Sequence, residues 1–447
     1  MKSYTMSRTI PLDDSWDVIV AGGGPAGCAA AAAAARDGAR TLLVEATGCL
    51  GGMGTAGLVT SWCPFTDGVR LIYSGLANEV FAKSREGIAH VASDELHGHK
   101  PFDPEQLKRV YDDLVMAHGV RVLFQSRLVG VDTEKGAVSA VFVGNKAGTT
   151  AYRARVYIDC TGDADLAAWA GADYEVGTPE TGEVMPASYC FVMSNVDSYA
   201  FAHGPGLFTG SPESPMWDIH RSGRYDAIYD AGLCPSLIGP DTVGFNTGHQ
   251  PNLDSTDPEA VSEAFIRGRR AAAQYREALA EYYSTAFANA HLAETAPLVG
   301  IRESRRVVGD YWFTEADYQA RRSFDDEICR NCYHTDMHSN RENEERSYEQ
   351  WRERTGKNTH YDQGESHGIP YRCLTPKGLE NVLVAGRPIS ADRVAHASVR
   401  VMPVCLATGE AAGTAAARAA AACGGNVHDV DVTTVRQRLR DQGAYLP

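Results

Sequence analysis

The feature that most constrains this chain is a glycine string between a short apolar run and a run of alanines. Residues 17–20 are largely apolar and lead into the string Gly-Gly-Gly-Pro-Ala-Gly at 22–27. Residues 28–36 are a helix by propensity, and Gly38 closes it. Residues 41–45 then form a second buried strand. The order strand, glycine turn, helix, strand predicts a parallel α/β sheet.

The glycine offsets have a chemical meaning in this context. Gly22 allows a tight turn, Gly24 lets backbone N–H groups approach a pyrophosphate, and Gly27 permits close packing of helix on strand. Glu45 ends the second strand 18 residues beyond Gly27, where an acid accepts hydrogen bonds from ribose hydroxyls. We therefore predict a dinucleotide site, with a purely structural glycine turn as the alternative.

Composition narrows the class of protein. A chain of 447 residues is long enough for two or three domains. Its 44% hydrophobic and 22% charged residues are typical of a globular protein. The formal net charge of −15 would repel phosphodiester backbones, so we expect no nucleic-acid partner.

The sequence also indicates a cellular compartment. The first 17 residues are polar, unlike a signal peptide, and the chain has no apolar stretch long enough to span a membrane. Its 11 cysteines are an odd number scattered along the chain, as expected of reduced thiols. We therefore expect a cytoplasmic protein that does not bind membranes.

The two ends of the chain have a similar sequence pattern. The apolar run at 381–386 again meets a glycine, and residues 407–422 are a helix rich in small residues. Between them lie a Gly/Pro/Ser-rich loop at 203–215 and a helical segment at 259–281. We predict a nucleotide-binding domain built from 1–175 and 369–447, with a substrate or cap domain at 176–368 inserted between its parts.

Further glycine-containing segments favour FAD over NAD as the dinucleotide. The glycine-rich loop at 49–57 follows the second strand and can run along a long cofactor. The turns at 161–163 and 385–387 each follow a buried strand, as expected where a sheet edge meets an extended FAD.

These segments resemble the FAD-dependent oxidoreductases related to the flavoprotein of succinate dehydrogenase and fumarate reductase, especially their widely distributed bacterial branch. The resemblance implies an FAD-binding domain of the glutathione-reductase type, with a parallel sheet, helices and an inserted α+β cap domain. The matching stretches are 22–27, 50–57, 102–105, 158–163, 300–306, 369–372, 385–387 and 396–403.

The resemblance also implies a set of FAD contacts. The pyrophosphate would lie against the glycine string, the adenosine ribose against Glu45, adenine against the backbone of Val129, and the ribityl chain near Gly386. The implied cofactor residues are Gly22, Gly24, Pro25, Ala26, Gly27, Glu45, Ala46, Gly52, Met53, Thr55, Val129, Thr161, Gly162, Gly386, Arg387, Val401, Met402, Pro403 and Val404.

Two details of this implied site involve charge. Residues 401–404 open the last alanine-rich helix, whose N–H groups and positive dipole would face the pyrimidine side of the flavin and stabilise its anionic reduced form. Many flavoproteins have Gly-Asp where this chain has Gly386-Arg387, so the carboxylate for the ribityl hydroxyl must come from elsewhere or be missing. Asp392 is a candidate substitute.

The expected catalytic groups are basic. Because His and Arg residues bind substrate carboxylates and relay a proton in the related fumarate-type enzymes, we predict His396 as acid or base. Arg302, Arg372 and Arg400 are predicted to hold the substrate or the flavin anion. The alternatives are a structural histidine and arginines that are ion-paired at a domain interface.

Cysteines and histidines raise three further possibilities. Cys329, Cys332, His334 and His338 could supply four metal ligands, but they form only one Cys-x-x-Cys, so we expect an ordinary loop and no metal. A redox thiol pair is the other alternative. Covalent attachment of the flavin is conceivable at Cys49 or Cys63.

The expected function is that of an FAD enzyme that moves a hydride between a small polar organic substrate and flavin N5. The alternatives are an electron-transfer subunit acting with partner proteins, and an FAD monooxygenase, against which the missing Gly-Asp argues. No second nucleotide fingerprint is present. The substrate, the direction of reaction and the electron acceptor stay open, and a homo-oligomer is possible.

Overall fold

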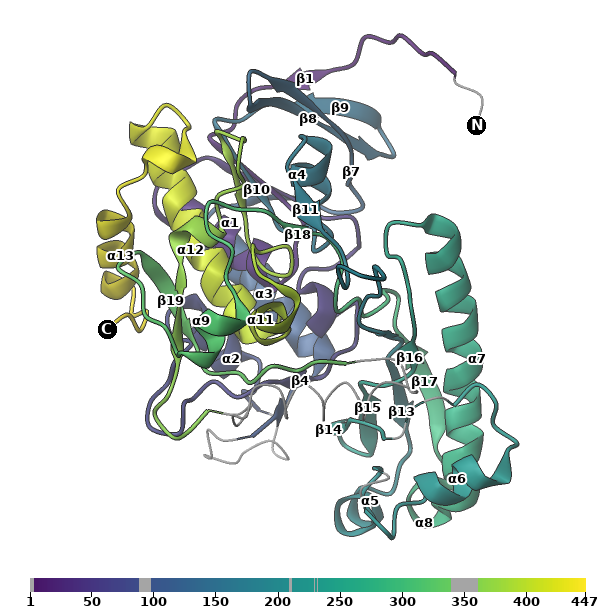
Figure 1. Cartoon of the computed structure of the whole chain (residues 1–447). Helices are drawn as coiled ribbons and strands as arrows, with labels where there is room; N and C mark the ends of the chain where they lie inside the picture. Colours follow the sequence, from purple (N-terminus) through teal and green to yellow (C-terminus); the bar gives the residue numbers. More distant parts are fainter. Residues whose placement is uncertain (1–3, 88–97, 209–210, 229, 231, 339–360) are drawn as a thin grey trace.

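A parallel sheet of five strands forms the centre of the larger lobe in the computed structural model, which describes residues 4–87, 98–208, 211–228, 230, 232–338 and 361–447 (Figure 1). Its strand order is β21-β10-β2-β3-β6. The strands are β2 (Val18–Ala21), β3 (Thr41–Val44), β6 (Arg121–Leu123), β10 (Val156–Asp159) and β21 (Val382–Val384). The predicted α/β fold with a parallel sheet is confirmed.

The two faces of this sheet are covered by different layers. Val18 and Val20 point to a core that contains the helices α1 (Pro25–Arg36), α3 (Pro104–Ala117) and α12 (Met402–Ala422). Ile19 and Ala21 point to a second core beneath the other layer. Because both faces are buried, the strands are continuous apolar runs rather than alternating ones.

The second layer is a smaller, mainly antiparallel sheet of order β1-β9-β8-β7, shown at the top of Figure 1. Its strands are β1 (Leu12–Asp13), β7 (Arg127–Glu134), β8 (Ala137–Asn145) and β9 (Gly148–Tyr152). The short helix α4 (Asp165–Trp169) lies in the same core.

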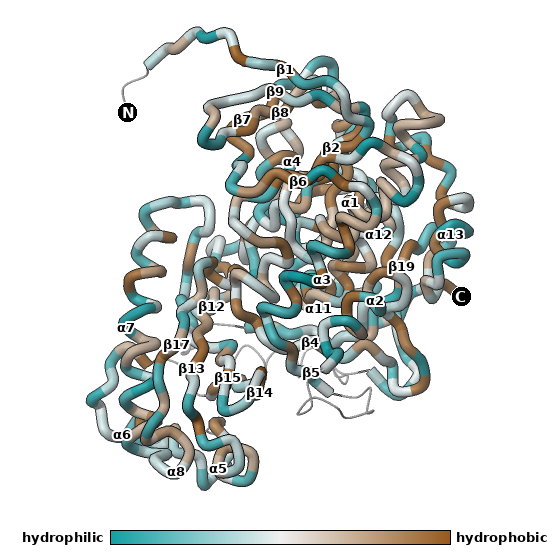
Figure 2. The backbone as a smooth tube through the Cα atoms, turned by 180° about the vertical axis from the view of Figure 1, so that it is seen from behind, coloured by the Kyte–Doolittle hydropathy of each residue, from teal (hydrophilic) through white to brown (hydrophobic). Residues whose placement is uncertain are grey.

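Helices α1 and α12 pack with their backbones unusually close. A Cβ atom on Gly409 would lie 2.1 Å from the Ala26 carbonyl oxygen, and one on Gly413 would lie 2.1 Å from that of Ala30. Residues 29–34 of α1 are all alanine with no exposed surface. Figure 2 shows apolar or near-neutral residues along both helices, in contrast to the hydrophilic α13 (Val432–Asp441).

The second lobe contains an antiparallel sheet of order β14-β15-β13-β17. Its strands are β13 (Phe191–Ser194), β14 (Pro235–Gly239), β15 (Thr242–Phe245) and β17 (His291–Thr295). The long helix α7 (Pro258–Tyr282) packs beside it, with α5 (Ser198–His203), α6 (Met216–Ser222) and α8 (Ser284–Phe287) (Figure 1). Phe191 stacks on Phe245 and Tyr275, with ring centroids 4.9 and 5.4 Å away.

The segment after this lobe returns to the larger one. It carries β18 (Arg306–Val307), α9 (Glu315–Gln319), β19 (Glu327–Asn331), β20 (His367–Pro370) and α11 (Arg393–Val399). Phe313, Tyr318 and Ile328 lie in the same core as α1 and α12. Part of the predicted cap range 176–368 therefore packs within the nucleotide-binding lobe.

Short elements complete the described chain. They are β4 (Ser61–Trp62), α2 (Leu76–Lys83), β5 (Lys100–Pro101), β11 (Tyr174–Glu175), β12 (Ala187–Ser188), β16 (His249–Gln250), and the 3-10 turns at Gly52–Gly54, Tyr371–Cys373 and Val427–Asp429. All 11 cysteines are free thiols. No helix in the described ranges is both long and apolar enough to cross a membrane.

Replacement of Gly413 by Ala tests the close contact between α1 and α12. Helix propensity alone favours alanine by about 1 kcal/mol. Because the new Cβ would clash with a backbone oxygen that cannot rotate away, we expect a net loss of about 1–3 kcal/mol of unfolding free energy. Chemical denaturation measures it.

The control is Ala421→Gly, at an exposed position of α12. This variant isolates the propensity effect and should lose at most about 1 kcal/mol. If Gly413→Ala is as stable as the parent protein, the two helices can move apart without cost, and their close contact does not constrain the fold.

Candidate functional site

One large cavity extends from the glycine string to the antiparallel lobe and has a volume of about 1470 Å³. This exceeds the roughly 300–1,000 Å³ of an ordinary small-molecule site, so there is room for a dinucleotide and a second molecule. The predicted cofactor residues that line it are Gly22, Gly24, Pro25, Ala26, Glu45, Ala46, Gly52, Met53, Thr161, Gly162, Gly386, Arg387, Val401 and Met402.

The glycine turn leaves open space above the start of α1. Gly22 has φ +95°, and a Cβ there would lie 2.4 Å from the Cys160 carbonyl oxygen. Gly24 is the N-cap of α1, and no atom lies within 4 Å of the position its Cβ would take. An anionic pyrophosphate fits such a cradle, since the N–H groups of the first turn face it and the helix dipole favours negative charge.

Glu45 is held rigidly at the end of β3. Its Oε2 accepts a hydrogen bond of 2.7 Å from the Gly23 N–H, and its Oε1 accepts one of 2.6 Å from the Thr47 N–H. Each carboxylate oxygen has a further lone pair. The carboxylate can therefore accept ribose hydroxyls at this edge of the cavity.

Five predicted cofactor residues do not line the cavity. Gly27 lies against the turn, because a Cβ there would be 1.8 Å from the Gly22 carbonyl oxygen. Thr55 donates its hydroxyl to the Leu50 carbonyl at 2.6 Å. Val129 is 52% exposed, although neighbouring Leu128 lines the cavity. Pro403 and Val404 are buried within the first turn of α12.

Arg387 fastens the turn at 161–163 to the rest of the site. Its guanidinium donates to the carbonyls of Gly162 and Ile301 and to Asp163 Oδ1, each at 2.8 Å. Gly162 has φ +83°, which favours glycine, and a Cβ there would lie 2.7 Å from the Arg387 Nη2 atom. The side chain thus has a structural use at the place where many flavoproteins have aspartate.

The candidate substitute for that aspartate faces elsewhere. Asp392 caps α11, where Oδ1 accepts from the Ala395 N–H at 2.8 Å and Oδ2 from the Glu315 N–H at 2.6 Å. Asp392 does not line the cavity, whereas Asp163 does. If a carboxylate contacts the ribityl end, the structure favours Asp163.

Two of the predicted arginines line the cavity. Arg302 Nη1 donates to the Pro186 carbonyl at 2.7 Å, and no described carboxylate forms an ion pair with this guanidinium. Burial, followed by the charge of Arg400, lowers the pKa of Arg302. Arg400 Nη2 contacts the carbonyl and the carboxylate of Asp336, at 2.9 and 3.2 Å.

Two Asp–His pairs lie in the same part of the cavity. His338 Nε2 is 3.1 Å from Asp336 Oδ1, and His249 Nδ1 contacts Asp230 Oδ1. The centroids of the two imidazole rings are 5.4 Å apart. Burial and the positive charge of Arg302 lower the pKa of His338 to about 4, so the ring is neutral at neutral pH.

His396 and Arg372 lie outside the cavity. His396 has no exposed surface, and its Nε2 contacts the Arg387 carbonyl at 2.9 Å. Burial holds the pKa of His396 well below its usual range. The guanidinium of Arg372 is half exposed and pairs with Asp326, with Nε 2.9 Å from Oδ2. The structure does not bring these two residues to Arg302 and Arg400.

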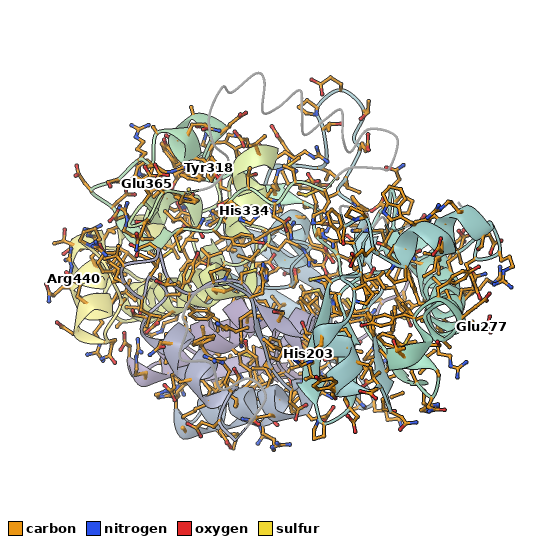
Figure 3. The ribbon with its side chains drawn as sticks, turned by 90° about the horizontal axis from the view of Figure 1, so that it is seen from below. His203, Glu277, Tyr318, His334, Glu365 and Arg440 are labelled. Atoms are coloured by element: carbon orange, nitrogen blue, oxygen red, sulfur yellow. The ribbon has the colours of Figure 1, made fainter. Side chains whose placement is uncertain are left out.

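Sequence reasoning missed Asp230 and His249. Asp230 lies in an irregular segment and His249 begins the two-residue strand β16, and neither belongs to a motif. Only the fold of the antiparallel lobe brings them together. Of the second pair, only His338 belongs to the Cys/His metal pattern in the sequence, and Asp336 lies two residues before it. Seen from below, His334 lies between the ends of the molecule marked by Glu277 and Arg440 (Figure 3), and it also lines the cavity.

The four residues of the Cys/His string do not converge. Cys329 is buried in β19, and Cys332 Sγ lies 3.4 Å from the Thr66 carbonyl, whereas His334 and His338 line the cavity. Within the described part of the chain, no three His, Cys, Asp or Glu side chains are grouped to hold a metal ion. Burial raises the pKa of the Cys63 thiol to about 12, which disfavours the nucleophilic thiolate.

Comparison with models of known protein families gives a match. A model of the FAD-dependent oxidoreductase family matches residues 17–439. No curated protein sequence matches the chain.

Similar solved structures have low identity to this chain. A geranylgeranyl bacteriochlorophyll reductase-like protein from Thermoplasma acidophilum is 13% identical with a TM-score of 0.48, over 98% of this chain and 85% of that one. An aromatic hydroxylase from angucycline biosynthesis is 13% identical with a TM-score of 0.47, over 96% and 68%. A myxobacterial chondrochloren halogenase is 14% identical with a TM-score of 0.44, over 97% and 79%.

Replacement of Gly24 by Val tests the cradle. The added side chain would occupy the open space above α1. No protein atom lies within 4 Å of its Cβ, so the fold should persist. We expect FAD affinity to fall at least about tenfold, which is about 1.4 kcal/mol. Fluorescence titration of the cofactor-free protein with FAD measures it.

The matched control is Gly206→Val, because Gly206 is exposed and also has no atom within 4 Å of its missing Cβ. This variant should bind FAD like the parent protein. Unchanged FAD affinity in Gly24→Val would place the pyrophosphate elsewhere.

Proposed function

Since the chain belongs to the FAD-dependent oxidoreductase family, we propose that it moves a hydride between a small polar organic substrate and flavin N5. When bound, FAD supplies the two-electron redox step. The protein then has to hold the substrate against the flavin, keep water away and handle one proton.

The observation that carries this proposal is a set of buried polar atoms that have no partner. Ser188 Oγ, His249 Nε2 and Arg400 Nε each lack a hydrogen-bond partner among the described residues, and all three residues line the cavity. A buried polar atom without a partner costs about 1–3 kcal/mol. A polar ligand that bonds to these atoms would recover that energy.

The arginines supply charge at the same place. The Arg400 side chain is 9% exposed, and it shares Asp336 with His338. Arg302 has only the Pro186 carbonyl as a hydrogen-bond partner among the described residues. A guanidinium that is withdrawn from water without a carboxylate favours an anionic group on the ligand.

We also propose kinship with the flavoprotein of succinate dehydrogenase and fumarate reductase, because basic side chains hold a substrate carboxylate there too. The start of α12 supports a flavin whose pyrimidine side faces this helix. Val401 is the N-cap of this helix of 21 residues. The N–H groups of Met402 and Val404 lie in its first turn, where the helix itself offers no acceptor, so they are free to face the cofactor.

The experiment that tests the function is anaerobic reduction of the purified protein. Its flavin absorption should bleach on addition of one class among sugars, hydroxy acids and amines, or of NADH. Bleaching only by a protein partner would favour the electron-transfer subunit, and oxygen-dependent hydroxylation of an aromatic compound would favour the monooxygenase. A protein that takes up no FAD would contradict the proposal.

Replacement of Arg302 or Arg400 by Met tests the anion-binding role. A hydrogen bond to a charged group contributes about 1.5–3 kcal/mol, so kcat/KM for the bleaching substrate should fall about tenfold to hundredfold. Stopped-flow reduction measures it, with FAD content recorded alongside. Arg372→Met is the control and should have the parent rate, because Arg372 pairs with Asp326 away from the cavity.

His396→Gln tests the proton-transfer role that the sequence predicts for this residue. Gln can still donate to the Arg387 carbonyl, so FAD should stay bound. Loss of substrate-driven bleaching would support acid–base chemistry at His396. Because the ring is sealed from the cavity, we expect a change of less than about tenfold, which would assign His396 to holding the loop at Arg387.

A further inference from the structure

We propose that the Asp230–His249 pair is the proton acceptor of this enzyme and that its substrate is a 2-hydroxy acid, oxidised to the 2-oxo acid. The inference rests on the proposed hydride transfer to FAD and adds to it a base and a substrate class. It depends on how the antiparallel lobe orients one imidazole toward the cavity.

Asp230 is a fixed support for the His249 ring. Besides contacting His249 Nδ1, its carboxylate accepts from the Tyr275 hydroxyl in α7 and from the Gly248 N–H at 3.2 Å. Burial opposes ionisation, but the hydrogen bond from His249 holds the pKa of Asp230 below its usual value. The carboxylate is therefore ionised and accepts the Nδ1–H proton.

This contact determines which nitrogen can act as a base. With the proton on Nδ1, the lone pair of His249 is on Nε2, and Nε2 is the atom that has no partner among the described residues. An aspartate that fixes the tautomer and orientation of a histidine is the arrangement used for general bases elsewhere. His249 lines the cavity, so a bound hydroxyl can reach it.

Other charged groups face the same space. His338 lies across from His249, and it is tied to Asp336, which also contacts Arg400. Arg302 stands near enough to lower the pKa of His338. The negative charges of the two aspartates are balanced by the positive charges of the two arginines. The guanidinium N–H groups of the arginines can donate hydrogen bonds to a ligand.

The chemical class of the ligand follows from this set. The unpartnered Arg400 Nε and the Arg302 guanidinium suit a carboxylate, while His249 Nε2 suits a hydroxyl proton. A 2-hydroxy acid carries both groups on adjacent carbons, together with the C–H bond that a flavin oxidises. A simple alcohol would leave Arg302, which pairs with no described carboxylate, without an anion.

The step balances with FAD as the oxidant. The O–H bond of the substrate breaks and its proton goes to His249 Nε2. The adjacent C–H bond breaks and its electron pair leaves with the hydrogen as a hydride to flavin N5, while the C=O bond forms. The substrate loses two electrons, FAD gains them, and His249 later returns its proton to water.

Binding is tested first with oxalate, which has carboxylates but no oxidisable C–H bond. The holoenzyme is titrated with oxalate, and the change in flavin absorption is followed. We expect saturable binding that is weakened at least about tenfold in Arg400→Met and unchanged in His249→Gln. Absence of oxalate binding to the parent protein would overturn the assigned substrate class.

Proton transfer is tested by anaerobic reduction with a series of 2-hydroxy acids of increasing length. General-base catalysis contributes about a hundredfold to ten-thousandfold, so His249→Gln should slow reduction by that factor while FAD and oxalate still bind. His203→Gln is the matched control, because His203 is exposed in α5 and lies outside the cavity. His338→Gln should retain more activity than His249→Gln.

The outcomes separate this inference from the proposed function. If another member of the substrate panel bleaches the flavin and no 2-hydroxy acid does, the substrate class is wrong and hydride transfer stands. If 2-hydroxy acids reduce His249→Gln at the parent rate, the base is wrong. If nothing in the panel bleaches the flavin, the proposed function itself fails.

Discussion

The close contact between α1 and α12 is the constraint on which the rest of the structure depends. Gly409 and Gly413 let the α12 backbone approach the carbonyl groups of Ala26 and Ala30. The contact places Gly409, which lies inside α12, beside Ala26 at the start of α1, and both helix N-termini border one cavity. Two partial positive charges from distant parts of the chain thus border the same space.

The central fold was predictable because its signals are local. Apolar runs such as 18–20 and 41–45 are buried on both faces, and the glycine turn at 22–27 specifies what joins them. The packing of residues 313–328 into the core of α1 and α12 was not predictable. That packing joins segments far apart in the chain, and no local periodicity records it.

The candidate site also has a part that was predictable from the sequence and a part that was not. Glu45 and Gly24 were assigned from spacing, because a helix N-terminus and a strand end impose their geometry nearby. His396 and Arg400 are neighbours in sequence, yet one is sealed beneath Arg387 and the other borders the cavity. Asp230 and His249 become neighbours only through a hairpin of the antiparallel lobe and the hydroxyl of Tyr275.

The placement of α12 has a consequence for how the protein is made. During synthesis, the apolar alanine face of α1 emerges several hundred residues before α12, the helix that covers it. The nascent chain therefore exposes this apolar surface until α12 has been made. Such a surface favours chaperone binding or aggregation, and the part of the cavity that α12 borders cannot form before α12 emerges.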